Sequence, residues 1–146
     1  MSTIALIVFV ILAAIAALHV AWGFGVRWPA HDERGLVALV VGATARTRLP
    51  PMFACLQAAA AIFIAGVVAL MLAQSTDSRA VDAAVTVLGS FIALVFALRG
   101  VAAYVPAWRL RFSQQPFATL DRYCYGPLSL LLAAAFALLV FRRMVS

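Results

Sequence analysis

The chain has 146 residues, of which 66% are hydrophobic and 11% are charged, and its formal net charge at pH 7 is +6. Soluble domains are closer to half apolar and a quarter charged, so this composition favours the lipid bilayer as the solvent. All the basic residues are arginines, and they are scattered through short loops without a basic helix or stripe. Attraction to anionic lipid headgroups explains such a charge, so we expect no nucleic-acid partner.

Four apolar stretches follow one another along the chain, and each is about as long as a membrane span. They cover roughly residues 3–24, 51–73, 80–103 and 120–141. Backbone groups in lipid must form their hydrogen bonds internally, so these stretches are expected to be helices. The uncharged start of the first stretch lacks the basic region of a signal peptide, so it is interpreted as a span. The sequence therefore predicts an all-α transmembrane four-helix bundle in a single domain, residues 1–146.

Two segments are less regular. Residues 35–43 (GLVALVVGA) are apolar but about half the length of a span. An interfacial helix, a shallow re-entrant segment and an amphipathic lead-in to the second span all fit them. Pro127 lies within the fourth stretch and has no N–H to donate to the Tyr123 carbonyl. We therefore expect the fourth helix to begin near Leu120 and to be kinked or loosened at Pro127.

Small residues recur at every fourth position in the first three stretches, a spacing that lets helices approach closely in lipid. We expect these stripes to pack within one bundle, and a dimerisation face is the alternative. They consist of Ala13, Ala17, Ala21 and Gly25; Ala61, Ala65, Ala69 and Ala73; and Gly89, Ala93 and Ala97.

The distribution of arginines predicts the orientation of the bundle. With four spans, the two termini and the loop near residues 75–79 share one side, with Arg79, Arg142 and Arg143. The two long loops share the other side, which carries Arg27, Arg34, Arg46, Arg48, Arg109, Arg111 and Arg122. The positive-inside rule then places the long loops in the cytoplasm and the termini outside, in a bacterial inner membrane.

Most polar residues of the spans fall at the long-loop end of the predicted bundle. They are His19, Arg99, Asp121 and Tyr125, with Cys55, Gln57 and Tyr123 at a similar depth. Aromatic residues at this level fit an interfacial belt, and they are Trp22, Trp28, Tyr104 and Trp108. The other half of the spans is nearly all alanine, leucine, valine, isoleucine and phenylalanine, so any site is expected at the long-loop end.

Each of these polar residues has more than one interpretation. Arg99 could anchor an anionic group, pair with Asp121, or extend to the lipid headgroups. His19 could bind a proton, a metal or a ligand, or it could be a neutral imidazole bonded to a neighbouring helix. Asp121 is predicted to cap the start of the fourth helix, which is compatible with an ion pair to Arg99, and Tyr125 could share its network.

No metal or cofactor is predicted. Cys55 and Cys124 belong to no Cys-x-x-Cys or Cys/His cluster. His31 falls in a loop, so His19 has no second membrane histidine at matching depth with which to hold a haem.

Three segments together resemble a known family. They are ALHVAWGFGVRWP (17–29), ALRG (97–100) and PFATLDRYCYGPLSLLL (116–132). They are similar to small bacterial four-helix integral membrane proteins grouped as domain of unknown function 3995. Members resemble this chain in a His-x-x-Trp-Gly, a Leu-Arg, and a Phe-Ala-x-Leu-Asp leading to Tyr-x-Pro-Leu. The resemblance implies that His19, Trp22, Arg99, Asp121 and Tyr125 belong to the family's pattern, and it implies no activity, cofactor or substrate.

We expect a non-enzymatic integral membrane protein in which His19, Trp22, Arg99, Asp121 and Tyr125 surround a polar pocket at one membrane face. Such a pocket would bind a lipid headgroup or a small anionic ligand. One alternative is an accessory subunit that packs against another membrane protein or a second copy. The other is a proton-coupled carrier or membrane enzyme with His19 and Asp121 as acid and base.

Overall fold

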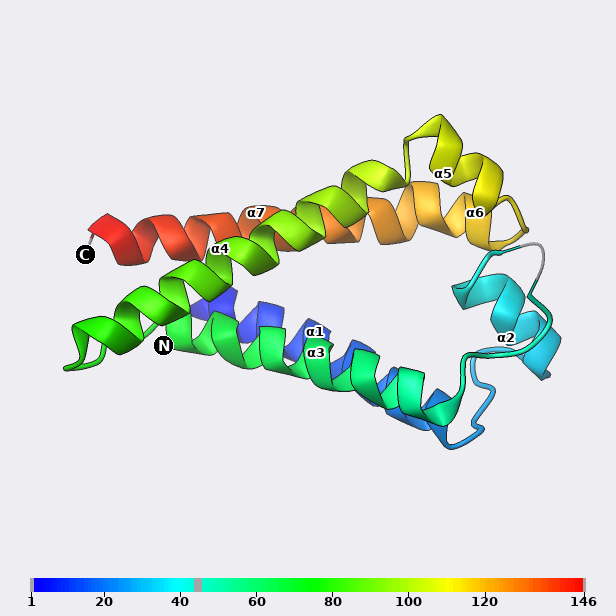
Figure 1. Ribbon diagram of the computed structural model, residues 1–146, viewed down its shortest axis with the longest axis horizontal. Coiled ribbons are helices and arrows are strands. Elements are labelled where there is room, and N and C mark those ends of the chain that lie inside the picture. The colour runs from blue at the N-terminus through cyan, green and yellow to red at the C-terminus, as the bar shows by residue number, and fades with distance from the viewer. Residues whose placement is uncertain (1, 44–45, 146) are drawn as a thin grey trace.

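The computed structural model describes residues 2–43 and 46–145, and every element in these ranges is helical (Figure 1). Four helical segments are long and apolar enough to cross a membrane. They are α1 (Thr3–Gly23), α3 (Met52–Leu72), α4 (Arg79–Ala102) and a continuous run from Phe117 to Val145. The predicted all-α four-helix bundle is therefore confirmed.

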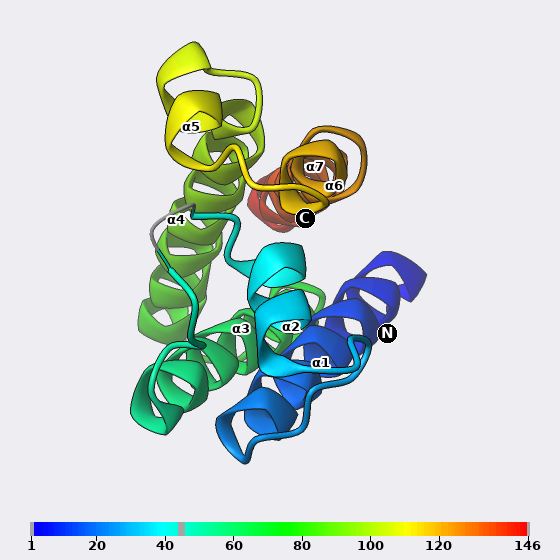
Figure 2. The same ribbon diagram turned by 90° about the vertical axis from the view of Figure 1, so that its right-hand side faces the viewer.

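The long helices form two pairs that diverge along the molecule. α1 packs mainly against α3, and α4 packs mainly against α7 (Gly126–Val145). The pairs lie close together near the two termini and separate toward the opposite end (Figure 1). There the short helix α2 (Glu33–Val40) lies between them, as Figure 2 also shows. The bundle is therefore wedge-shaped, closed at the terminal end and occupied by α2 at the long-loop end.

The hydrophobic core fills the closed half of the wedge. Its most deeply buried side chains include Leu12 of α1, Ala69 of α3, and Phe136 and Leu139 of α7. Gly89 of α4 makes a close approach possible, because a Cβ there would lie 2.7 Å from a Leu72 methyl carbon. In lipid such tight packing, rather than exclusion from water, holds helices together.

The small-residue stripes lie partly inside this core and partly outside it. Ala65, Ala69 and Gly89 are buried between helices, whereas Ala17 and Ala61 are exposed. Packing within one chain therefore leaves members of the first two stripes exposed, whereas Gly89, Ala93 and Ala97 of the third stripe are all at least partly buried.

Arg143 joins the two helix pairs at the closed end. Its guanidinium donates to the carbonyls of Met71 and Gln74, where α3 ends, and to the Asp82 carboxylate on α4. The side chain is only 7% exposed. Because one residue of α7 contacts both α3 and α4, it links the two pairs to each other.

α2 is a separate helix, so the segment 35–43 is not a lead-in to the second span. Asp32 caps it by accepting a hydrogen bond from the Gly35 N–H at 2.7 Å. Its Leu36 and Val37 side chains are fully buried. Gly42 follows with φ +68°, and a Cβ there would lie 2.0 Å from the Phe117 ring. The ring of Phe117 thus packs directly on the backbone that leaves α2.

The fourth span corrects the predicted role of Asp121. Its first turn is α6 (Phe117–Leu120), so the helix begins upstream of Asp121 and that residue is not the N-cap. A π-helical segment, η1 (Asp121–Tyr125), follows, and the Gly126 N–H bonds to the Asp121 carbonyl. This wide turn directly precedes Pro127, whose missing N–H cannot complete a normal turn. The loosening expected at Pro127 is therefore present as a π segment.

Candidate functional site

Asp121 is the centre of a buried polar cluster at the long-loop end. Its Oδ1 accepts a hydrogen bond from Nη2 of Arg99 at 2.5 Å, and its Oδ2 accepts one from Nε1 of Trp108 at 2.9 Å. Asp121 is 4% exposed, so both carboxylate oxygens meet a donor inside the protein. The predicted ion pair to Arg99 is present, and the Trp108 contact comes from α5 (Pro106–Arg111).

Arg99 is held on two sides by this cluster. Its guanidinium carbon lies 5.2 Å from the centre of the Trp108 ring, within the range of a cation–π contact. Within the described part of the chain, Nη1 of Arg99 is buried and meets no hydrogen-bond partner. The charge of Arg99 is offset by Asp121, but the guanidinium retains unused donors.

Tyr125 joins α2 rather than Asp121, contrary to the predicted shared network. Its hydroxyl donates to the Leu39 carbonyl at 3.2 Å, and its ring lies 5.8 Å from the Phe117 ring. Tyr125 and Phe117 therefore attach α2 to the fourth span at the open end of the wedge.

His19 bonds within its own helix, not to a neighbouring one as one interpretation of the sequence held. Its Nδ1–H donates to the Ile15 carbonyl at 2.9 Å, because a carbonyl oxygen can only accept. In the neutral imidazole this leaves Nε2 as an acceptor. The ring of Trp22 packs against it at a centroid distance of 4.9 Å, and Nε1 of Trp22 donates to the Trp28 carbonyl. Both side chains are therefore fixed in orientation.

A cavity of about 480 Å³ lies in the open half of the wedge, and we refer to it as the wedge pocket. It is bounded by α1, α2, α4 and the fourth span. Most of its wall is apolar, including side chains from Leu18, Leu39, Phe96, Phe117 and Leu128. Its polar side chains include His19, Arg99, Tyr125 and Ser129. Cavities of this size and character accommodate small apolar or amphipathic molecules.

The structure brings four of the five predicted site residues to one cavity. His19, Trp22, Arg99 and Tyr125 line the wedge pocket, whereas Asp121 is buried and does not line it. Asp121 therefore acts on the pocket through Arg99. Of the other polar residues expected at this depth, Gln57 and Tyr123 are exposed on the outer surface.

Sequence reasoning missed two contributors to this region. Trp108 was assigned only to an aromatic belt, although it bonds Asp121 and stacks on Arg99. Phe117 was noted only as part of the family pattern, although it lines the pocket and contacts Gly42. Trp108 lies two residues after Pro106, in a short helix with Arg109 and Arg111. This sequence context does not indicate that Trp108 contacts Asp121 or Arg99.

By length and composition the four apolar helices are candidate membrane spans, the arrangement typical of the class of helical multi-pass membrane proteins. The chain belongs to the family described as "Protein of unknown function (DUF3995)", whose family model matches residues 12–136. The matched range includes all five predicted site residues. No curated protein and no solved structure matches the chain.

Proposed function

We propose that this protein binds a lipid-like amphiphile, with the apolar part of the ligand in the wedge pocket. The observation that carries the proposal is a partly open cavity of about 480 Å³ with mainly apolar walls between the helix pairs. Such walls offer a chain-like apolar ligand the packing contacts that also hold helices together in lipid.

The polar walls indicate the chemistry of the ligand's polar group. His19 presents an acceptor at Nε2, because its Nδ1–H is already bonded to Ile15. Arg99 supplies donors on the opposite helix pair, with its charge offset by Asp121. This pairing favours a neutral polar group over a free small anion held by Arg99 alone: a hydroxyl can donate to Nε2 of His19 and accept from Arg99, and an ester carbonyl can accept from Arg99.

The acid–base alternative has less support. Among the residues described, the Asp121 carboxylate bonds to Arg99 and Trp108, and no hydrogen bond joins it to His19. Both carboxylate oxygens of Asp121 therefore already have donors within the protein. We therefore favour binding over proton transfer.

We place the wedge pocket in the cytoplasmic half of a bacterial inner membrane. The support is the excess of arginines in the two long loops, which meet at the open end of the wedge. The termini and the loop between α3 and α4 would then face outward.

The test fills the pocket without changing its polarity. Leu128 lines the wedge pocket, whereas Leu131 on the same helix is 69% exposed on the outside. Purified Leu128→Trp and Leu131→Trp are equilibrated with phosphatidylcholine vesicles, and native mass spectrometry counts the lipids that remain on each monomer. We expect Leu131→Trp to retain lipid like the unmodified protein and Leu128→Trp to lose it. Equal retention by two equally stable variants would refute the proposal.

The polar contact is tested by His19→Leu in phosphatidylcholine vesicles that contain diacylglycerol, because the diacylglycerol hydroxyl can donate to the Nε2 acceptor that this variant removes. We expect lipid to be retained more weakly, with a smaller loss than in Leu128→Trp. If the bound species is instead a protein, both pocket variants will keep it, and the accessory-subunit alternative gains support.

A further inference from the structure

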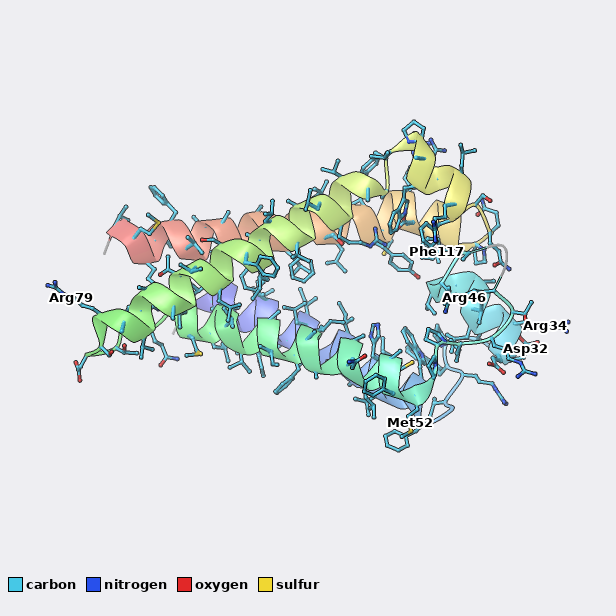
Figure 3. The ribbon with its side chains drawn as sticks, in the orientation of Figure 1. Asp32, Arg34, Arg46, Met52, Arg79 and Phe117 are labelled. Carbon is cyan, nitrogen blue, oxygen red and sulfur yellow. The ribbon has the colours of Figure 1, made fainter. Side chains whose placement is uncertain are left out.

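A second hollow lies on the outside of the open end, where α1 stops and α2 begins. It has a volume of about 590 Å³, and Arg27, Arg34 and Arg48 share its wall with Asp32, Glu33 and Thr47. We refer to it as the arginine hollow. Figure 3 shows Asp32 and Arg34 at this end of the molecule, opposite Arg79. None of these residues lines the wedge pocket.

The two acidic residues of the arginine hollow are already engaged by the backbone. Asp32 accepts from the Gly35 N–H at 2.7 Å, and Glu33 accepts from the Leu49 N–H at 3.1 Å. Over residues 2–43 and 46–145, no ion pair or side-chain hydrogen bond involves Arg27, Arg34 or Arg48. Three arginines that form no ion pair within the described residues therefore line one hollow, and guanidinium forks match the oxygens of a phosphate.

The arginine hollow is adjacent to the wedge pocket through a series of smaller cavities. Trp22 lines the wedge pocket and also a cavity of about 200 Å³ beside Gly23 and Gly25. Arg27 and Glu33 line that cavity and the arginine hollow as well. The apolar space and the arginines are thus neighbours around the end of α1.

We propose that the arginine hollow binds the phosphate of an anionic phospholipid whose acyl chain occupies the wedge pocket, an inference that rests on the function proposed above. The hydroxyl or ester part of that lipid lies between, at the level of His19 and Arg99. Apolar chain, ester and phosphate then follow one another in the order in which the protein presents apolar walls, neutral polar groups and free arginines.

The test compares two variants with the same change in charge. One is Arg27→Gln/Arg34→Gln/Arg48→Gln. Its control is Arg46→Gln/Arg109→Gln/Arg111→Gln, in which Arg46 lies in the same connection between α1 and α3, Arg109 and Arg111 lie in α5, and none lines the hollow. Each protein is equilibrated with vesicles of equal phosphatidylcholine and phosphatidylglycerol. Native mass spectrometry then measures the ratio of the two lipids that remain bound.

We expect the unmodified protein and the control to retain phosphatidylglycerol preferentially. In the hollow variant, we expect the ratio of bound phosphatidylglycerol to bound phosphatidylcholine to be lower by at least about tenfold. Equal preference in the hollow variant and the control would overturn the inference, because general surface charge would then explain it.

Two further comparisons distinguish this inference from the proposed function on which it rests, and lipid binding from the binding of a free anion. If Leu128→Trp loses both lipids while the hollow variant loses neither, the wedge pocket stands and the phosphate site falls. If Leu128→Trp loses neither while the hollow variant loses phosphatidylglycerol, the arrangement of chain and headgroup across both cavities is overturned. Binding of inorganic phosphate alone to the unmodified protein, absent in the hollow variant, would overturn the lipid as ligand and leave a site for free phosphate.

Discussion

Arg99 on α4 and Asp121 in η1 form an ion pair at 2.5 Å that joins the third and fourth spans at the open end of the wedge. Asp121 is almost completely buried, while the Arg99 side chain is 31% exposed and lines the wedge pocket. The pair therefore both fastens α4 to the fourth span and neutralises the pocket wall. Replacing one member of the pair and replacing both are therefore expected to change stability differently.

Replacing Arg99 by leucine leaves the Asp121 carboxylate buried without its cation. Breaking a buried pair in this way costs about 3–5 kcal/mol, and we expect the lower end because Arg99 is partly exposed. The double variant Arg99→Leu/Asp121→Leu removes the unpaired charge and should recover much of the loss. Unfolding in detergent, followed by thermal or denaturant titration, measures both, with exposed Arg109→Leu as control. A double variant less stable than the single one would contradict this account.

Replacing Trp108 by phenylalanine keeps an aromatic ring over Arg99 but removes the Nε1 donor to Asp121. A buried acceptor left unsatisfied costs about 1–3 kcal/mol, so unfolding should be easier by that amount. Trp28→Phe is the matched control, because Trp28 is 64% exposed and its ring nitrogen makes no hydrogen bond within the described residues. Similar stability of Trp108→Phe and Trp28→Phe would show that the indole donor contributes little.

Replacing Gly42 by alanine should detach α2 from the fourth span. Alanine at a positive φ is itself destabilising by about 1 kcal/mol, and here the new Cβ would also meet the Phe117 ring. Gly25→Ala separates the two effects, because Gly25 has φ +85° but nothing within 4 Å. We expect hydrogen exchange of the α2 amides to accelerate in Gly42→Ala and to stay unchanged in Gly25→Ala. Equal exchange in both variants would exclude a role for the Phe117 contact.

Arg143 and its neighbour Arg142 differ in role despite their equal charge. Arg143 donates to Met71, Gln74 and Asp82, whereas Arg142 is exposed. We expect Arg143→Gln to lower stability by about 1–3 kcal/mol and Arg142→Gln to change it by less than about 0.5 kcal/mol. Parallel unfolding curves in the same detergent measure the difference. Equal effects would mean that only net charge matters at the closed end.

The proposed orientation is tested with single cysteines in a background of Cys55→Ala/Cys124→Ala. Ser75 and Ser113 are both exposed, in the loop between α3 and α4 and in a long loop, respectively. An impermeant maleimide should label Ser75→Cys in intact cells and Ser113→Cys only after the membrane is opened. The reverse pattern would place the long loops outside.

The positions of the spans could be predicted because bilayer thickness and backbone hydrogen bonding constrain them strongly. Starts and ends differ from expectation by at most one residue for the first three spans. The fourth differs more, beginning at Phe117 and extending to Val145, because the π turn around Asp121 absorbs the irregularity that Pro127 imposes. The depth of a residue in a span also follows from its distance in sequence from the end of that span. For this reason the sequence predicts His19, Arg99 and Tyr125 at one end of the bundle.

The sequence by itself determined the number of span-length helices, their apolar character and the end of the bundle at which His19, Arg99 and Tyr125 gather. Only the tertiary structure decided that Tyr125 bonds Leu39, that Trp108 bonds Asp121 and that Arg143 joins both helix pairs. These contacts depend on how each helix is rotated about its axis and on which helices pair. Helices that are apolar on every side contain little periodic signal for either, because lipid and neighbouring helices are equally apolar surroundings.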